Sequence, residues 1–326
     1  MSLVCWAPGR VNLIGEHTDY AGGLVLPVAI DLGIALDVEP AEAIRLTSDG
    51  ETVELGPDGT GRADGWGRYV AAVAQELAEL GRRAVGIDGA VEATLPQGAG
   101  LGSSGAFAVG VALALCGVAE FELEPLEVAQ ACQRAERRAV GVPSGILDQA
   151  ASLLGRAGSA LLLDCGSLEH RWVPLPDDVA ILVLDSGERH AHEVSGYADR
   201  RRELEAGDPR RVRHVDTENE RVRAAVEALE RGDVSALGPL FAASQASLRD
   251  DYEVSTPTLD TLVAATLAAG AFAARMTGGG FGGSIVALAE RTGARDVLAG
   301  SGAEGRIVES ADGAIRRRKG STRGRA

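Results

Sequence analysis

Residues 96–104 have the sequence PQGAGLGSS, and this glycine-rich segment decides the fold that we expect for the chain. It lies between a β-rich run at 91–95 and an almost wholly apolar run at 106–118, which is typical of a buried helix. Alternating glycines let the backbone turn tightly and bring its N–H groups close to an anion, and a helix start adds positive potential. The segment therefore predicts an anion-binding turn between strand and helix, with a purely structural turn as the alternative.

The lysine content excludes two common kinds of site chemistry. Of the 32 basic residues, all but Lys319 are arginine. A P-loop needs a lysine after its glycines to reach the phosphates, and a Schiff-base enzyme needs a lysine nucleophile. Segment 96–104 is not a Rossmann fingerprint either, because Ser103 stands where G-x-G-x-x-G needs a glycine.

The composition indicates an acidic globular protein of two domains. The 326 residues carry 32 basic and 47 acidic side chains, and the net charge of −15 argues against a nucleic-acid surface. No apolar stretch approaches the roughly 18 residues of a membrane span. The segment 174–178, rich in Pro and Asp, is the best boundary, so we expect domains at 1–176 and 177–326. A basic tail from about residue 316 is expected to be solvated and frayed.

The cysteines favour a reducing compartment. They show no CxxC spacing and are too few for a disulfide scaffold, so we interpret them as buried thiols of a cytoplasmic protein. We also expect a monomer.

Hydrophobic periodicity predicts helices at 66–80, 106–118, 125–139, 144–154, 197–205, 218–231 and 257–269, and strands at 24–30, 34–38, 44–47, 91–95, 160–164, 179–185 and 284–289. Ser144 is expected to cap the fourth of these helices.

Two further segments carry clustered polar or glycine residues. Residues 277–284 (TGGGFGGS) match G-x-G-x-x-G, but the strand-like run that follows disfavours a dinucleotide site. Residues 7–23 (APGRVNLIGEHTDYAGG) place Arg, Glu, His and Asp side chains between paired glycines. Such groups can recognise several sugar hydroxyls, whereas one His with two carboxylates is a poor zinc set. A salt-bridged surface loop is the alternative.

Two acidic residues gain no role from spacing alone. Glu136 lies on the helix expected at 125–139, where an ion pair with a neighbouring arginine is the simplest interpretation. Asp148 falls in the first turn of the next helix, where a carboxylate complements the helix dipole.

Together these segments resemble the galactokinase family of the GHMP kinases. The matching motifs are APGRVNLIGEHTDY, PQGAGLGSS, GVPSGILDQ, SLRDDYEVSTPTLDTLV and RMTGGGFGGS, and the resemblance runs from about Ala7 to Gly313. It implies an α+β fold with an N-terminal domain like ribosomal protein S5 domain 2 and a ferredoxin-like C-terminal domain. Departures from the family pattern are Gly105 for Ala, Ala21 for Asn and Gln245 for His, and none removes a residue that the resemblance assigns to chemistry.

The resemblance also implies roles for individual residues. Asp148 would be the catalytic aspartate that orients the anomeric hydroxyl of the sugar, and Arg10 would stabilise charge on the transferring phosphoryl group. The ligand-binding residues would be Gly98, Gly100, Gly102, Ser103 and Ser104 for the phosphates of ATP, Trp66 and Tyr69 near its adenine, Ser104 and Glu136 for Mg²⁺, and Glu16, His17, Asp19, Gly145 and Tyr197 for galactose.

The function implied is ATP-dependent phosphorylation of α-D-galactose at O1, the first committed step of galactose use in the Leloir pathway. One alternative is another sugar 1-kinase, acting on arabinose, N-acetylgalactosamine or a uronic acid. A second is a non-enzymatic regulator that binds galactose and ATP on the same fold. Neither nucleic acid nor membrane is expected as a partner.

Overall fold

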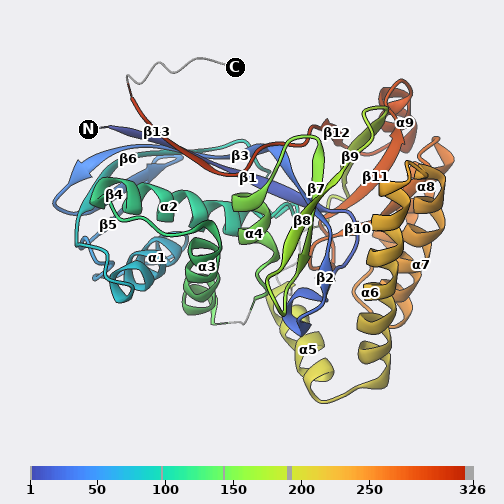
Figure 1. The fold of residues 1–326 in the computed structure, drawn as a ribbon, viewed down its shortest axis with the longest axis horizontal. Helices are drawn as coiled ribbons and strands as arrows, with labels where there is room; N and C mark the ends of the chain where they lie inside the picture. The colour runs from blue at the N-terminus through green and yellow to red at the C-terminus, as the bar shows by residue number, and fades with distance from the viewer. Residues whose placement is uncertain (1, 97, 142–143, 189–192, 320–326) are drawn as a thin grey trace.

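The computed structural model describes residues 2–96, 98–141, 144–188 and 193–319 of the chain. Two α/β regions lie side by side, with a small sheet between them (Figure 1). The first region comes from the first half of the chain and the second from the second half. Within the described ranges, every helix is too short or too polar to span a bilayer.

A six-stranded sheet forms the base of the first region, in the order β13-β1-β3-β6-β4-β5. Its strands are β1 (Leu3–Asn12), β3 (Pro27–Ala41), β4 (Ile44–Ser48), β5 (Glu51–Leu55), β6 (Gly86–Ala93) and β13 (Ile315–Arg318). Neighbouring strands are antiparallel except β4 and β6. A parallel pair needs a crossover connection, which β5 and the first long helix supply here.

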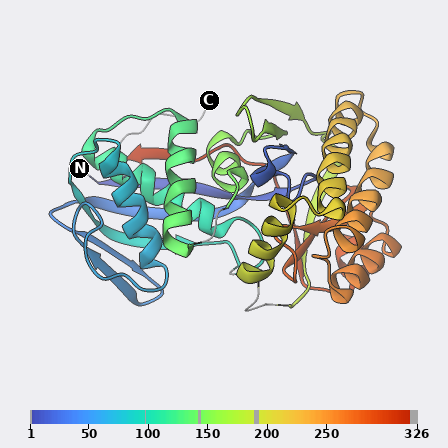
Figure 2. The same ribbon diagram turned by 90° about the horizontal axis from the view of Figure 1, so that it is seen from below.

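Helices cover one face of this sheet (Figures 1 and 2). They are α1 (Gly67–Glu79), α2 (Ser103–Ala119), α3 (Pro125–Val140) and α4 (Leu147–Leu154). α2 packs on β1 and β3 with one face and on α1 and α3 with the other, which explains why it is apolar on all sides. It begins at Ser103, three residues before the expected run, so its N-terminus lies at the glycine-rich turn.

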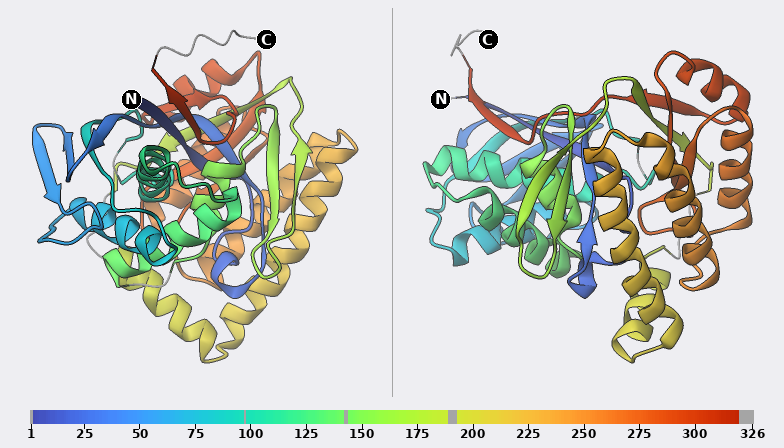
Figure 3. Two further views of the ribbon diagram at one scale, coloured as in Figure 1. Left: turned by 60° about the vertical axis from the view of Figure 1, so that its left-hand side comes forward. Right: turned by 45° about the vertical axis from the view of Figure 1, so that its right-hand side comes forward.

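A four-stranded antiparallel sheet, in the order β10-β11-β9-β12, forms the second region. Its strands are β9 (Val179–Asp185), β10 (Ala273–Thr277), β11 (Ser284–Glu290) and β12 (Gly305–Val308), and its helices are α5 (Glu193–Glu205), α6 (Pro209–Glu230), α7 (Leu237–Asp250), α8 (Pro257–Ala268) and α9 (Ala294–Ser301). The small sheet between the regions is β2-β7-β8, with β2 (Leu24–Val25), β7 (Ser159–Asp164) and β8 (His170–Pro174). Short 3₁₀ turns occur at Asp19–Ala21 and Val234–Ala236. Figure 3 shows α6 extending beyond the sheets to meet α5.

The largest hydrophobic core continues from one region into the other. It joins residues of β1 and α2 to Phe241 of α7 and Val286 of β11. A domain boundary at 176–177 therefore stays a prediction. The expectation of a frayed tail from about residue 316 is wrong for residues 316–318, because β13 pairs with β1 from Trp6↔Ile315 to Leu3↔Arg318.

Most predicted elements are confirmed, with α3 and β9 closest to their expected bounds. Two expectations are wrong. Residues 27–41 form one long strand in place of two short ones. Ser144 does not cap α4, which begins at Leu147, because its hydroxyl donates instead to Glu136 Oε2 at 2.8 Å.

Candidate active site

A cavity of about 340 Å³ lies where the two regions meet. Six segments line it: β1 with the loop after it, α1, the glycine-rich turn with the start of α2, α3 with the start of α4, α5, and the loop after β10. All of the predicted site residues except Trp66 border this cavity. The residues that line it are Arg10, Asn12, Glu16, His17, Asp19, Tyr69, Gly98, Gly100, Leu101, Gly102, Ser103, Ser104, Glu136, Val140, Ser144, Gly145, Leu147, Asp148, Tyr197, Gly278 and Gly279.

The glycine-rich turn has the backbone that its sequence predicts. Gly98, Gly100 and Gly102 all have positive φ, between 66° and 73°, a conformation that favours glycine. Gly102 is the N-cap of α2, so the first N–H groups of that helix lie at the cavity wall without intrahelical acceptors. The turn therefore presents backbone donors and the positive end of a helix dipole to any anion in the cavity.

Arg10 connects this turn to Asp148. Its Nε donates to Asp148 Oδ1 at 2.8 Å, its Nη2 lies 2.6 Å from the same oxygen, and its Nη1 donates to the Gly100 carbonyl at 2.5 Å. Gly105 allows α2 to approach closely, because a Cβ there would lie 2.6 Å from the Cβ of Asp148. The side chain of Asp148 is 24% exposed, which leaves its second oxygen free to meet a hydroxyl in the cavity.

Ser104 and Glu136 form a second pair on the other side of the turn. The Ser104 hydroxyl donates to Glu136 Oε1 at 2.7 Å, while Ser144 and Gln149 donate to Oε2 at 2.8 Å each. Burial, followed by the negative charge of Asp148, raises the pKa of Glu136. A cation here would offset that repulsion. A hydroxyl and a carboxylate are hard oxygen ligands, so this pair fits Mg²⁺ shared with nucleotide phosphates.

His17 stands at the opposite end of the cavity in a fixed tautomer. Burial and the neighbouring His214 lower its pKa to about 3, so the ring is neutral at physiological pH. Its Nε2 lies 3.2 Å from the Gly279 carbonyl, which can only accept, so Nε2 carries the proton. Nδ1 therefore accepts from the Tyr20 hydroxyl at 2.9 Å. The Tyr197 ring, 5.4 Å away between centroids, covers the imidazole.

Asp19 and Gly145 fit one another. A Cβ at position 145 would lie 1.6 Å from Asp19 Oδ2, so only glycine leaves room for that carboxylate. Burial, followed by the charge of Asp148, raises the pKa of Asp19 to about 6. Of the carboxylates that border the cavity, Asp148 is thus paired with arginine, whereas Asp19 has no arginine at hydrogen-bonding distance in the described structure.

The structure separates the two aromatic residues expected near adenine. Tyr69 lines the cavity, whereas Trp66 lies outside it, against Phe107 at 5.8 Å between centroids, with its N–H donating to Glu51. Sequence reasoning missed Asn12, Ser144 and the Gly278–Gly279 backbone as cavity residues. Two of these could have been found from the sequence, because Asn12 lies within the polar segment 7–23 and the two glycines lie within TGGGFGGS.

Three protein-family models match the chain. They are the galactokinase galactose-binding signature at residues 2–40, the GHMP kinases N terminal domain at 68–156 and the GHMP kinases C terminal domain at 225–301. Among curated proteins, the galactokinase of Streptomyces coelicolor is 40% identical, and the alignment covers 88% of this chain and 84% of that protein. The galactokinase of Thermococcus kodakarensis is 37% identical, with 87% and 89% covered.

Solved structures show the same fold. The Lactococcus lactis galactokinase complexed with galactose superposes with a TM-score of 0.88 at 29% identity, covering 96% of this chain and 95% of the other. The Methanococcus jannaschii mevalonate kinase superposes with a TM-score of 0.72 at 20% identity, covering 95% and 98%, a likeness of fold alone.

Proposed function

The chain belongs to the galactokinase family of the GHMP kinases, and we propose that its cavity transfers the γ-phosphoryl group of ATP to O1 of α-D-galactose. The products are galactose 1-phosphate and ADP, which begins the use of galactose in the Leloir pathway. One observation carries the proposal. Arg10 joins Asp148 to the glycine-rich turn, between the Ser104–Glu136 pair and the polar loop that holds Asp19.

Asp148 orients the attacking hydroxyl. One of its oxygens is held by Arg10, so the carboxylate cannot rotate, and the exposed side of the group faces the cavity. In the loose transition state of phosphoryl transfer, positioning matters more than early proton removal. Asp148 therefore aligns O1 with the phosphorus and takes its proton late in the reaction.

Arg10 and the turn stabilise the negative charge of the transferring group. The guanidinium lies against the turn, since its Nη1 donates to the Gly100 carbonyl at 2.5 Å and a Cβ at Gly102 would be 3.5 Å from Arg10 Cζ. The N–H groups at the start of α2 add fixed dipoles at the same place. Ser104 and Glu136 would hold Mg²⁺, which when bound supplies charge neutralisation to the phosphates of ATP.

The loop after β1 binds the sugar in this proposal. The Asp19 carboxylate accepts hydrogen bonds from sugar hydroxyls, while the Gly145 backbone lets the ring approach. Tyr197 and His17 supply ring surface and fixed polar atoms beside it. Glu16 borders the same end of the cavity and would contact the sugar, and Tyr69 would lie near the adenine of ATP. We also propose that the protein is a cytoplasmic monomer. The four cysteines are free thiols, which supports a reducing compartment.

A single-turnover experiment tests the proposal. Asp148→Asn is expected to slow phosphoryl transfer by about 10²- to 10⁴-fold while galactose binding persists. Asp296→Asn is the matched control, because Asp296 also lies in the first turn of a helix, far from the cavity. Transfer by Asp148→Asn at a near wild-type rate would reject the mechanism.

A sugar panel tests the substrate. The wild-type enzyme should turn over galactose in preference to glucose, arabinose, N-acetylgalactosamine and galacturonic acid. Preference for another of these sugars would move the assignment to that 1-kinase. Tight binding of galactose and ATP without any ADP release would make the chain a regulator.

A further inference from the structure

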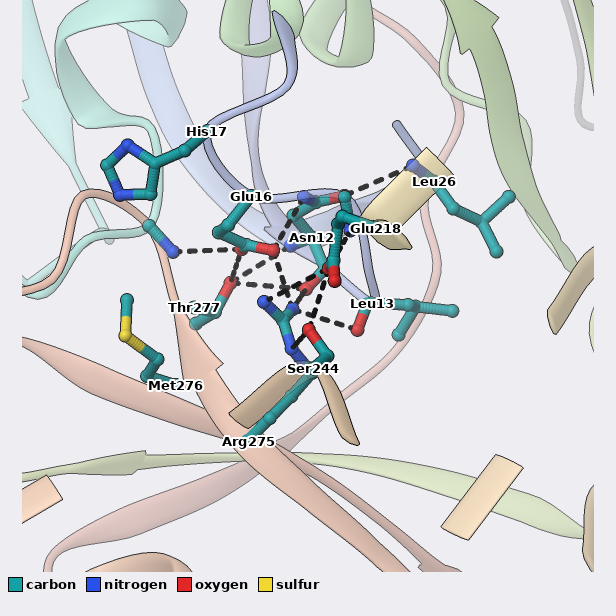
Figure 4. Close-up of polar contacts among 12 residues, drawn as sticks. Asn12, Leu13, Glu16, His17, Leu26, Glu218, Ser244, Arg275, Met276 and Thr277 are labelled. Carbon is teal, nitrogen blue, oxygen red and sulfur yellow. Dashed lines mark hydrogen bonds and ion pairs between the residues drawn. The ribbon is translucent and has the colours of Figure 1, made fainter. Parts of the chain in front are cut away.

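A buried polar network surrounds Glu16, which borders the cavity beside His17, and Figure 4 shows its contacts. We call it the Arg275 network, and its members are Asn12, Glu16, Glu218, Ser244, Arg275 and Thr277. Arg275 on β10 and Glu218 on α6 have no exposed surface at all. Charged side chains are rarely so deeply buried unless ion pairs and hydrogen bonds offset the cost of removing them from water.

Arg275 binds the sugar loop through one end of its guanidinium. Its Nη1 lies 2.6 Å from Glu16 Oε2, and it donates to the Leu13 carbonyl at 3.0 Å and the Asn12 carbonyl at 3.3 Å. Its Nε donates to the Ser244 hydroxyl of α7 at 3.1 Å. A single side chain of the second region thus contacts the last residue of β1 and two groups of the loop that follows it.

The Glu16 carboxylate is held on both of its oxygens. Asn12 Nδ2 donates to Oε2 at 2.9 Å, beside Arg275, and the Gly278 N–H donates to Oε1 at 3.0 Å. The Thr277 hydroxyl lies 3.2 Å from Oε1. These contacts leave the carboxylate one orientation, at a residue that is buried and borders the cavity.

Glu218 holds the same loop from the other side. Its Oε1 accepts from the Gly15 N–H at 3.0 Å and from Ser244 at 2.7 Å, and its Oε2 accepts from Arg221 Nε at 2.7 Å. Arg275 Nη2 is 4.0 Å from Glu218. Two carboxylates and two guanidinium groups therefore balance in charge beneath the loop.

We propose that Arg275 is a positioning residue for sugar recognition, which fixes Glu16 in the orientation that the sugar meets. The inference rests on the proposed function, because it gives a role to a group behind the same site. It extends the site to a residue that does not line the cavity. It also makes the second region responsible for sugar affinity, although the turn that binds phosphates belongs to the first.

The charges around Glu16 show what the loss of Arg275 does. Burial raises the pKa of Glu16 and Arg275 opposes that rise, while Glu218 adds to it. His17 and His214 face the same loop, and burial lowers the pKa of both, so neither replaces the lost cation near neutral pH. Without Arg275, Glu16 becomes protonated at a higher pH. One of its oxygens then donates a hydrogen bond, whereas the ionised carboxylate can only accept.

Kinetics of two variants test the proposal. Arg275→Lys keeps the charge but loses the planar fork that serves Glu16, Leu13 and Ser244 together. Arg275→Met loses both. Each is expected to raise the KM for the sugar by at least about tenfold, the equivalent of one charge-assisted hydrogen bond. The KM for ATP should change by less than about twofold, because the phosphate turn is untouched. Arg291→Lys is the control, since Arg291 is a half-exposed arginine of the second region that pairs with Glu309.

The pH profile separates positioning from general damage. In Arg275→Met, the pH below which the sugar KM rises should lie higher than in the wild type, and in Arg275→Lys it should not move. Circular dichroism identifies the folded variants, and if Arg275→Met does not fold, Arg275→Lys decides the question. A folded Arg275→Lys with a sugar KM within about twofold of wild type would overturn the proposal, as would an equal rise in the KM for ATP. The sugar used is the one that the wild-type enzyme phosphorylates best, so a wrong sugar assignment would change the proposed function and leave this test intact.

Discussion

Galactose binding should weaken as the pH falls through about 6, because Asp19 then gains a proton. In the proposed site the ionised carboxylate accepts hydrogen bonds from sugar hydroxyls, and a protonated group loses part of that capacity. With a pKa of about 6, roughly one Asp19 in eleven is ionised at pH 5, so the Kd should rise about tenfold between pH 7 and pH 5.

The stability of the protein should respond to the same proton in the opposite sense. The pKa of Asp19 in the folded chain lies above the ordinary value of 3.8, so the folded state binds more protons between 3.8 and about 6. Stability therefore falls as the pH rises through that window. Asp19→Asn, which carries no charge, should be more stable than wild type at pH 7 by about 1–3 kcal/mol while binding galactose less tightly.

Calorimetric titration of galactose without ATP, from pH 5 to pH 8, measures the effect. Asp19→Asn should show a raised Kd that no longer changes with pH, and the surface variant Asp296→Asn should follow the wild type. A wild-type Kd that stays constant down to pH 5 refutes the reasoning. If Asp19→Asn keeps the full pH dependence, a different carboxylate, such as Glu16 or Glu136, is the titrating group.

Three further perturbations have defined outcomes. Gly145→Ala forces the Asp19 carboxylate out of its place, since the added methyl would overlap it, and should raise the galactose KM by at least about tenfold with kcat affected less, as steady-state kinetics would show. Glu76→Gln removes a buried carboxylate that pairs with two arginines of α3 and should cost about 1–2 kcal/mol of unfolding free energy in urea titrations, so an unchanged midpoint would contradict this account. Chelation of divalent metal should abolish turnover, and Ser104→Ala should raise the Mg²⁺ concentration needed for half-maximal rate; an unaltered requirement would count against the Ser104–Glu136 pair.

Local sequence signals predicted the parts of the site that depend on short-range geometry. The alternating glycines of PQGAGLGSS have positive φ, which glycine adopts without strain, and the apolar run after them forms a buried helix. A tight turn at the start of a buried helix was therefore predictable. The polar segment 7–23 likewise contains in one stretch the groups that we propose to bind the sugar. The family resemblance then supplied roles that spacing alone left open.

Long-range contacts explain the failures. Ser144 has the chemistry of an N-cap, but Glu136, from another helix, competes for its hydroxyl. Trp66 and Tyr69 are neighbours in the sequence, yet only Tyr69 lies on the helix face that turns to the cavity. The partners of Arg275 on the loop after β1, Leu13 and Glu16, are more than two hundred residues away, so no local pattern marks that residue.

The pairing of β13 with β1 also has a consequence for synthesis on the ribosome. β1 carries Arg10, and its edge partner Ile315–Arg318 is translated about 300 residues later. At roughly 5–20 residues per second, about 15–60 s separate the two events. Throughout that interval the nascent chain has an unpaired β-edge on the strand that carries Arg10, and such an edge promotes aggregation between neighbouring polysomal chains.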